Sequence, residues 1–194
     1  MEYQLKIIAS LILAVFFIFF FGRNFVLKIQ LKKSIIGHDP FIFITILTFT
    51  FIVTVFLLSI WNRNSVFIFF SISSLNHDTV KIIAMILMVF ATIICIISSL
   101  TLRNSWRVGI PSGEKTKLIR HGIYSRCRNP YFLAYYTFFL SMFLFSANSL
   151  IGFIMVVGII PLHRLVLKEE KYLEGIHGNY YLGYKNNVKR YWLF

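Results

Sequence analysis

The most regular feature of this sequence is a set of long apolar stretches separated by shorter polar segments. Four stretches contain no Asp, Glu, Lys or Arg, at positions 7–22, 40–62, 82–102 and 129–163. An α-helix rises about 1.5 Å per residue, so roughly 20 apolar residues are needed to cross a hydrocarbon core about 30 Å thick. The first three stretches therefore predict one membrane-spanning helix each, at Leu5–Phe21, Phe41–Ile60 and Val80–Leu100.

The fourth stretch has 35 residues, which is too long for one span and predicts two. Polar residues at its middle, Ser146–Ser149, mark the turn of a helical hairpin between Tyr131–Phe145 and Leu150–Leu167. Pro161 lies inside the second arm, where its missing N–H predicts a kink. A further apolar segment, Ser65–Leu75, is too short to cross and is interpreted as an interfacial or re-entrant piece.

Composition agrees with membrane insertion and excludes several other classes of protein. Hydrophobic residues make up 58% of the chain, Phe occurs 22 times, and only 14% of residues are charged. A soluble domain has about 25% charged residues. So much apolar surface excludes a disordered chain and a water-soluble globule. The two cysteines exclude a disulfide framework and a thiolate zinc cluster, so no metal is expected.

The positive charge gives the predicted spans a direction. The formal net charge is +13, and 17 of the 20 Lys and Arg residues lie in Arg23–Lys33, Arg103–Arg128 and Arg164–Arg190. With five spans these segments fall on one side of the membrane, which the positive-inside rule makes cytoplasmic. The same charge attracts anionic membrane lipid, and a nucleic-acid partner is not expected. We therefore expect an integral protein of the plasma (inner) membrane with a cytoplasmic active face.

These observations together predict the fold class. It is an all-α integral membrane protein with about five transmembrane helices, the last two a tight hairpin, and a small cytoplasmic cap. The whole chain, 1–194, is expected to be one membrane domain, with 1–102 as anchoring spans and 103–194 as a core that contains the helical hairpin and the C-terminal cap. Because the hairpin returns to its starting side, the polar segments that flank it, Arg103–Tyr131 and His163–Phe194, must be neighbours in space.

Two features of this cap point to chemistry. Asn129 and Pro130 are placed as N-cap and first residue of the hairpin helix, whose N-terminal N–H groups attract an anion. Arg128 adds a positive charge there, although simple capping, with arginines that reach lipid phosphates, is the alternative. Glu169 and Glu170 are two of only seven acids. Adjacent carboxylates at a membrane surface need a partner, and a local salt-bridge cluster is the alternative for this pair.

An ordered pattern runs through the second half of the chain. It reads Leu-x3-Gly-x-Tyr-x3-Arg-Asn-Pro, then a charge-free hairpin, then Glu-Glu-x2-Leu and Gly-x2-Tyr-x2-Tyr-x3-Val. Its residues are Leu118, Gly122, Tyr124, Arg128, Asn129, Pro130, Glu169, Glu170, Leu173, Gly178, Tyr181, Tyr184 and Val188. This set resembles the isoprenylcysteine carboxyl methyltransferase family, in particular its prokaryotic members, and the related phospholipid methyltransferases. The resemblance covers about Ser105–Arg190.

The resemblance implies that S-adenosylmethionine is the methyl donor and that it binds at the cytoplasmic membrane surface. The residues implied to line the donor pocket are Lys117, Leu118, Ile119, Tyr124, Asn129, Pro130, Tyr131, Phe132 and Glu169. The family also has an arginine about one turn before the paired acids, at the acceptor. Arg164 is the nearest candidate, with an offset that differs by one residue. Arg164 and Arg128 are therefore the expected catalytic residues.

The acceptor is less well indicated than the donor. The Arg-His-Pro of eukaryotic family members is Arg-Asn-Pro here, and Phe132 stands where a tyrosine is usual. A carboxylate or thiolate acceptor needs no general base, whereas an amine must lose a proton. His121, His163 and His177 are the candidate bases, and each also fits an interfacial or capping role. The missing obvious base favours methylation of a lipophilic or prenylated carboxylate, such as isoprenylcysteine, that enters sideways from the bilayer.

Other functions stay open at this stage. A phospholipid amine or a thiol is the alternative acceptor. A non-catalytic membrane protein would use the basic face to hold anionic membrane lipid. A membrane reductase with a related hairpin core would bind a nicotinamide cofactor instead of the methyl donor.

Overall fold

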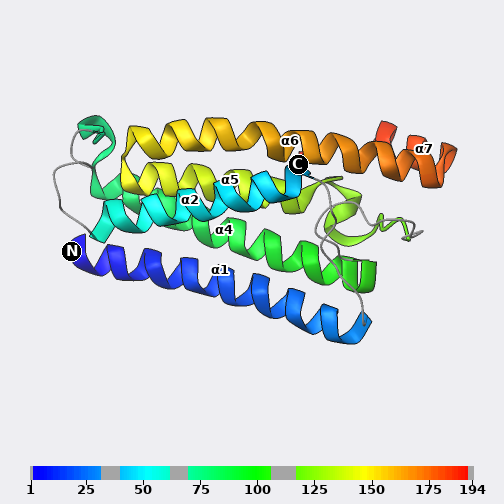
Figure 1. Cartoon of the computed structure of the whole chain (residues 1–194), viewed down its shortest axis with the longest axis horizontal. Helices are drawn as coiled ribbons and strands as arrows, with labels where there is room; N and C mark the ends of the chain where they lie inside the picture. The colour runs from blue at the N-terminus through cyan, green and yellow to red at the C-terminus, as the bar shows by residue number, and fades with distance from the viewer. Residues whose placement is uncertain (1, 32–39, 62–69, 106–116, 192–194) are drawn as a thin grey trace.

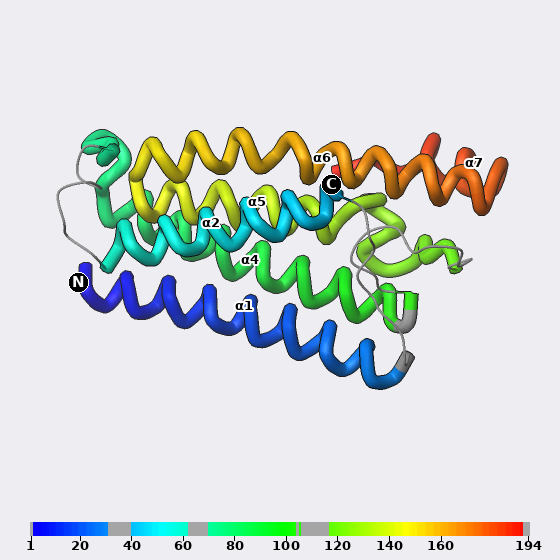
Figure 2. The backbone as a smooth tube through the Cα atoms, viewed as in Figure 1, coloured from blue at the N-terminus to red at the C-terminus, as the bar shows by residue number. Residues whose placement is uncertain are grey.

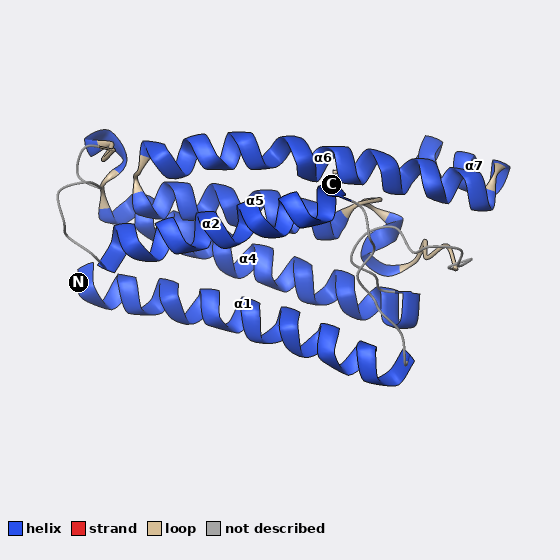
Figure 3. Cartoon of the chain, in the orientation of Figure 1, coloured by secondary structure: helices blue, strands red, loops and turns tan. Residues whose placement is uncertain are grey.

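The computed structural model describes residues 2–31, 40–61, 70–105 and 117–191. Within these ranges the regular structure is helical apart from two isolated bridges (Figure 3). The α-helices are α1 (Glu2–Leu31), α2 (Pro40–Trp61), α4 (Asp78–Leu102), α5 (Pro130–Ser146), α6 (Ser149–His177) and α7 (Asn179–Asn187). The short 3-10 helices are η1 (Ser73–Leu75), η2 (Arg103–Ser105) and η3 (Gly122–Ser125).

The long helices lie side by side along the long axis of the molecule (Figure 1). Among the described residues, α1, α2, α4 and α6 are long and apolar enough to cross a membrane, and α5 is a shorter apolar helix of 17 residues. Successive helices run in opposite directions, so the N-terminus lies at one end of the bundle and α7 at the other (Figure 2). The expected all-α integral membrane protein is confirmed, with α5 as the short member of the predicted spans.

The end of the bundle that carries α7 also gathers basic residues. Arg23, near the end of α1, donates from its guanidinium to the carbonyl oxygen of Arg103, after α4, over 3.0 Å. A parallel bridge joins Cys127, before α5, to Lys189, after α7. Parts of all three basic segments therefore lie at one end, as the count of spans predicts.

Two helices are longer than the apolar stretches that predict them. The helix predicted to end at Phe21 continues to Leu31, and the one predicted to end at Leu167 continues to His177. Apolar length marks only the part of a helix that lies in hydrocarbon, whereas Lys, Arg and Glu extend a helix readily beyond it. α6 also continues as a helix on both sides of Pro161. The last ten residues of α6 add about 15 Å beyond the predicted span, and the paired acids lie in the first turn of this extension.

The hairpin turn falls at the predicted position. Ala147 adopts a left-handed φ of 47° and ends α5. The side chain of Asn148 caps α6 by accepting from the backbone N–H groups of the next two residues at 3.0 and 3.4 Å. The N–H of Ile72 donates to the carbonyl of Ala147 over 2.7 Å, so the described part of the predicted interfacial segment packs on this turn. Residues 65–69 of that segment lie outside the described residues.

Packing between the helices is uneven. α5 packs along α4, α1 packs along α4, and α2 packs along α6, whereas α1 and α2 contact each other little. Small side chains such as Ala91 of α4 and Ala134 of α5 are completely or almost completely buried. Gly158 lets α6 approach α2 closely, because a Cβ at this position would lie 2.6 Å from Thr48 Cγ2. α1 and α2 are therefore only loosely packed against each other.

Candidate functional site

The end of the chain pairs with the residues just before α5. The backbone N–H groups of Arg128 and Asn129 donate to the carbonyls of Lys189 and Arg190 over 2.9 and 3.0 Å. The prediction that the two polar segments beside the hairpin are neighbours is confirmed. Residues 188–191 are called the C-terminal strap below.

Glu170 of α6 is the centre of a buried ionic cluster next to the strap. Arg190 donates to its two carboxylate oxygens over 3.0 and 2.9 Å. Arg128 donates to Oε1 over 3.1 and 3.4 Å, and the side-chain amide of Asn129 donates to the same oxygen over 2.8 Å. The Glu170 and Arg128 side chains are 5% and 8% exposed. Two guanidinium groups and one carboxylate leave this cluster with one excess positive charge.

Arg128 has a second set of contacts that are purely structural. Its guanidinium also donates to the carbonyl oxygens of Lys185, near the end of α7, and of Val188 in the strap. A guanidinium has five N–H donors in a fixed plane, and most of them are used here within the protein. Arg128 therefore ties α6, α7 and the strap together.

Asn129 and Pro130 hold the predicted positions at the start of α5, but not with the expected bonding. Asn129 is the N-cap residue, and Pro130 is the first residue of the helix. The Asn129 side chain makes no capping hydrogen bond; its NH₂ group donates to Glu170 instead. The N-terminus of α5 carries the partial positive charge of a helix start, which favours an anion at this position.

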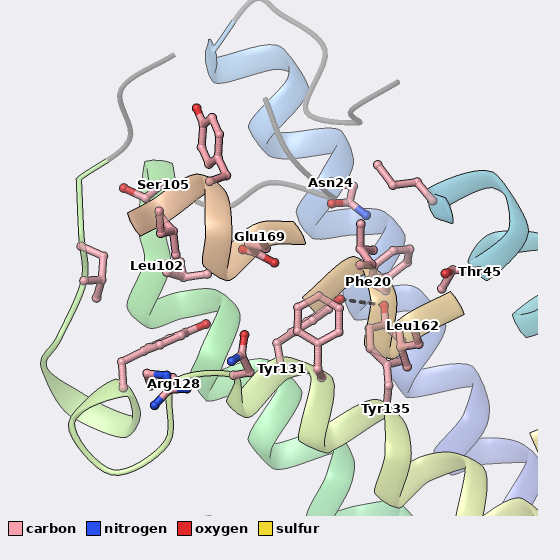
Figure 4. A pocket seen from close by; sticks show the side chains of 18 of the residues that line it. Phe20, Asn24, Thr45, Leu102, Ser105, Arg128, Tyr131, Tyr135, Leu162 and Glu169 are labelled. Atoms are coloured by element: carbon pink, nitrogen blue, oxygen red, sulfur yellow. Dashed lines mark hydrogen bonds between the residues drawn. The ribbon is translucent and has the colours of Figure 1, made fainter. Parts of the chain in front are cut away.

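A cavity of about 310 Å³ begins beside this cluster and continues down into the helix bundle. The cap end is lined from the segment before α5, from α6 and from α7, and the lower end from α1, α2 and α5. Figure 4 shows Glu169, Asn24, Phe20 and Tyr131 around one shared space, although they come from three different helices. One continuous cavity therefore connects the charged cap with the apolar interior.

The structure brings most of the predicted site residues together. Those that line the cavity are Lys117, Leu118, Ile119, Tyr124, Arg128, Asn129, Tyr131, Phe132 and Glu169. Pro130 is buried at the start of α5 and does not line it. Arg164 lies on an exposed face of α6, apart from the lining residues.

The two adjacent acids have different surroundings. Glu169 lines the cavity and is half-buried. Among the described residues it has no hydrogen bond or ion pair, whereas Glu170 has several. Glu169 therefore presents a carboxyl group to whatever occupies the cavity.

α7 forms a fixed wall at the cap end. The Tyr184 hydroxyl donates to the carbonyl oxygen of Tyr124 over 2.6 Å, and both side chains line the cavity. Burial raises the pKa of both phenols, so they stay neutral near pH 7. Lys185 also pairs with Glu174 of α6 over 2.9 Å. These contacts hold α7 against α6 and against the segment before α5.

The lower arm of the cavity is mostly aromatic. Its aromatic lining consists of Phe17, Phe20, Phe21, Phe49, Tyr131, Phe132, Tyr135 and Phe139. The hydroxyl groups of Tyr131 and Tyr135 are hydrogen-bonded to each other over 3.0 Å (Figure 4). Phe21 of α1 and Ile46 of α2 line the cavity, yet they are 62% and 46% exposed on the outer surface. We interpret these two residues as the edge of a lateral mouth between α1 and α2, on a surface that faces lipid if both helices span the membrane.

Sequence reasoning missed some residues of this site. Asn24, Thr45 and Thr50 bring polar atoms to the α1–α2 side of the cavity. Nothing in their spacing distinguishes them from other polar residues of apolar helices. Arg190 also went unassigned, because the recognised pattern ends at Val188. The one available signal was its place in a basic segment that must lie beside Glu170.

The three histidines considered as bases lie elsewhere. None of them is among the residues that line this cavity. His163 is hydrogen-bonded through Nδ1 to the Tyr191 hydroxyl over 2.8 Å, which fastens the strap to α6. His121 is exposed, and His177 is half-buried in the last turn of α6. The described part of the chain also has no group of three or more His, Cys, Asp or Glu side chains that would hold a metal ion.

Comparison with known proteins assigns the chain to a family. Residues 79–180 match the family described as Phospholipid methyltransferase. This range is just over half of the chain and runs from α4 into α7, so it contains the hairpin, Arg128 and both adjacent acids. None of the curated proteins compared with the chain matches it. The family match supports methyltransferase activity at the membrane on a lipophilic substrate. The chain belongs to the phospholipid methyltransferase family.

Proposed function

We propose that this chain is a membrane methyltransferase that uses S-adenosylmethionine and methylates a lipophilic carboxylate, such as that of an isoprenylcysteine. The observation that carries the proposal is one cavity with a charged cap end and an aromatic lower arm, lined in part by residues that are exposed on α1 and α2. A polar donor and an apolar acceptor can meet in such a space. In-line transfer of a methyl group depends mainly on this positioning.

The residues at the cap end fit the parts of the donor. Glu169 offers a carboxylate to an ammonium group or to ribose hydroxyls. The uncapped N-terminus of α5 suits the donor's carboxylate, and Leu118 and Ile119 suit its adenine. When bound, S-adenosylmethionine supplies a methyl group on a positively charged sulfur. The cavity of about 310 Å³ lies within the usual range of ligand pockets, roughly 300–1,000 Å³.

Arg128 is assigned a positioning role in this proposal. Its guanidinium is already engaged by Glu170 and by two backbone carbonyls, so few of its N–H groups are left for a ligand. It keeps Asn129 and the start of α5 in place at the cavity. Arg164 is given no role, because it lies outside the cavity lining.

The lining of the cavity favours an acceptor that is already anionic. Of the described residues that line it, Glu169 is the only acid and none is a histidine. A carboxylate acceptor needs no base, whereas an amine would have to give its proton to Glu169. The excess positive charge of the Arg128–Arg190–Glu170 cluster also attracts an anion to this end. The aromatic arm would hold the acceptor's apolar tail and exclude water.

A phospholipid amine is the second candidate acceptor, because the matched family is that of the phospholipid methyltransferases. In this case Glu169 would take the proton of the amine. A thiol acceptor would need only deprotonation and is chemically compatible as well. We also propose that the cap faces the cytoplasm from the plasma (inner) membrane, since the basic segments gather at that end.

Donor binding is the first test. Isothermal titration calorimetry of the purified protein with S-adenosylhomocysteine should show binding in detergent and in lipid nanodiscs. Absence of binding in both media would overturn the proposal. Thermal melts with S-adenosylhomocysteine and with NADPH separate it from a reductase, which only NADPH would stabilise. A protein stabilised only by anionic vesicles would be a non-catalytic lipid-binding protein.

The second test identifies the chemical class of the acceptor. Membranes that contain the protein are incubated with methyl-labelled S-adenosylmethionine, and the label is sorted into chemical fractions. Base-labile label in a prenylcysteine ester supports the carboxylate acceptor. Base-stable label in a phospholipid headgroup would replace it with the amine acceptor.

A further inference from the structure

We propose that Arg190, in the C-terminal strap, is a positioning residue of the donor site that acts through Glu170 on Asn129. The inference rests on the proposed function and deepens it. Arg190 lies beyond residues 79–180, so the family match assigns it nothing. It follows from two contacts that link the strap to the cavity, and from the place that the proposed function gives to the donor's amino-acid end.

The first contact fixes the carboxylate of Glu170. Arg190 Nε donates to Oε1 over 3.0 Å and Nη2 donates to Oε2 over 2.9 Å. Two parallel hydrogen bonds from a planar guanidinium set the plane of the carboxylate as well as its position. Arg128 contacts only Oε1, so Arg190 alone among the described residues holds Oε2. Without Arg190, the carboxylate would be held only at Oε1, by Arg128 and Asn129, and its plane would be less well fixed.

The second contact transfers this orientation to Asn129. A carboxylate only accepts hydrogen bonds, so it selects the NH₂ end of the facing amide. Asn129 Nδ2 donates to Glu170 Oε1 over 2.8 Å, which turns Oδ1 away from Glu170. Asn129 lines the cavity, and among the described residues no donor is bonded to its Oδ1. This oxygen is therefore an acceptor available to a ligand.

The third step identifies the ligand group. Asn129 directly precedes α5, and the proposed function assigns the amino-acid end of the donor to the first turn of that helix. The ammonium of the donor would lie between the Asn129 oxygen and the carboxylate of Glu169. Orientation of Asn129 therefore contributes to binding of the amino-acid end and not to binding of the adenosine.

The strap itself does not depend on the side chain of Arg190. Its backbone carbonyl accepts from Asn129 N–H over 3.0 Å, and the Tyr191 hydroxyl is bonded to His163 over 2.8 Å. Truncation of Arg190 should remove the two bonds to Glu170 and leave these attachments. Lys189 provides a matched control, since it joins the strap through its backbone and its side chain is exposed.

The test compares two ligands in full-length protein. S-adenosylhomocysteine has the amino-acid end, and 5′-methylthioadenosine has the same adenosine and thioether without it. Calorimetry is carried out on wild type, Arg190→Ala, Arg190→Lys and Lys189→Ala. We expect S-adenosylhomocysteine to bind about tenfold more weakly to Arg190→Ala, because one charge-assisted contact is lost. The loss should be smaller in Arg190→Lys and absent in Lys189→Ala, and methylthioadenosine affinity should be unchanged throughout.

Each of the other outcomes overturns either the inference alone or the proposed function together with it. Unchanged S-adenosylhomocysteine affinity in Arg190→Ala overturns the inference and leaves the proposed function intact. An equal loss for both ligands makes Arg190 a residue that only stabilises the cap, which also overturns the inference. Failure of the wild-type protein to bind S-adenosylhomocysteine overturns the proposed function, and the inference with it.

Discussion

Glu169 and Glu170 are consecutive residues of α6 whose carboxylates face different surroundings. Glu170 is buried against Arg128, Asn129 and Arg190, whereas Glu169 lines the cavity. Neighbouring positions on an α-helix differ by about 100° around its axis. One side chain of the pair therefore faces the strap while the other faces the cavity. This relationship separates an acid that supports the cap from an acid that can contact a ligand.

Glu169→Gln should weaken binding of S-adenosylhomocysteine about tenfold or more without loss of stability. The substitution keeps the shape of the side chain and removes the ionisable carboxyl group that, in the proposed function, faces the donor's ammonium. No ion pair among the described residues is lost with it. Calorimetry measures the affinity, and a thermal melt in detergent measures the stability. Undiminished affinity would remove Glu169 from the donor site.

Glu170→Gln should instead destabilise the protein, by roughly 3 kcal/mol. It leaves the buried guanidinium of Arg128 and the partly buried one of Arg190 without their carboxylate, and the Arg190 side chain is 32% exposed. Partial hydration of Arg190 reduces the penalty, so the effect is set mainly by Arg128. The melting temperature without ligand is the measurement. A variant that melts like wild type would show that the cluster contributes little to the fold.

The helices of this fold could be predicted because hydrocarbon excludes charge. A helix in the bilayer cannot carry unpaired Lys, Arg, Asp or Glu, so the spans can be read as gaps between charged residues. Outside hydrocarbon this constraint ends, and the true ends of α1 and α6 at Leu31 and His177 are not visible in the apolar pattern. The hairpin turn was predictable as well, because Asn148 both interrupts the apolar run and caps the next helix.

For the site, the sequence predicted several of the residues and their order along the chain, but not how their side chains contact one another. The spacing of the pattern identified Arg128, Asn129 and Glu169, which do line one cavity. It did not show that Glu170 takes the amide of Asn129, because that bond depends on how the strap returns to α5. The pattern also did not show that residues of α1 and α2 line the cavity. Residues such as Thr45 gain their role from helix packing, which leaves no local signal in an apolar sequence.

The lateral mouth can be tested by narrowing it. Ile46→Trp adds bulk at a residue that lines the cavity and is 46% exposed on α2. We expect it to raise the KM for a lipid acceptor severalfold and to leave S-adenosylhomocysteine affinity unchanged, because the cap lies elsewhere. Phe153→Trp is the control, since Phe153 is 67% exposed on α6 and does not line the cavity. Equal acceptor kinetics in both variants would exclude entry between α1 and α2.

The attachment of α7 can be tested through one hydroxyl group. Tyr184→Phe removes the donor to the Tyr124 carbonyl, a bond of 2.6 Å between buried groups. An unsatisfied buried carbonyl costs roughly 1–3 kcal/mol, so the melting temperature should fall. Tyr180→Phe is the matched control, because Tyr180 is 56% exposed and its hydroxyl accepts only from the exposed Arg120 among the described residues. A similar small effect of both substitutions would contradict a structural role for the Tyr184 hydroxyl.

The thiol of Cys127 should be nearly inert in the folded protein. Burial raises its pKa to about 11, and its Sγ–H donates to the carbonyl oxygen of Arg190 over 3.2 Å. Only the thiolate reacts, so at pH 8 roughly one thiol in a thousand would be reactive, against about one in four for a thiol with a pKa near 8.5. Below the raised pKa, the rate of thiol labelling should rise about tenfold per pH unit.

The measurement is N-ethylmaleimide labelling of a Cys95→Ala variant, followed by intact mass, so that Cys127 is the only cysteine that can be labelled. Labelling in SDS confirms that the thiol is present. Rapid native labelling at pH 8 would mean that the strap leaves this thiol accessible and that its contact with Arg190 is not maintained in solution.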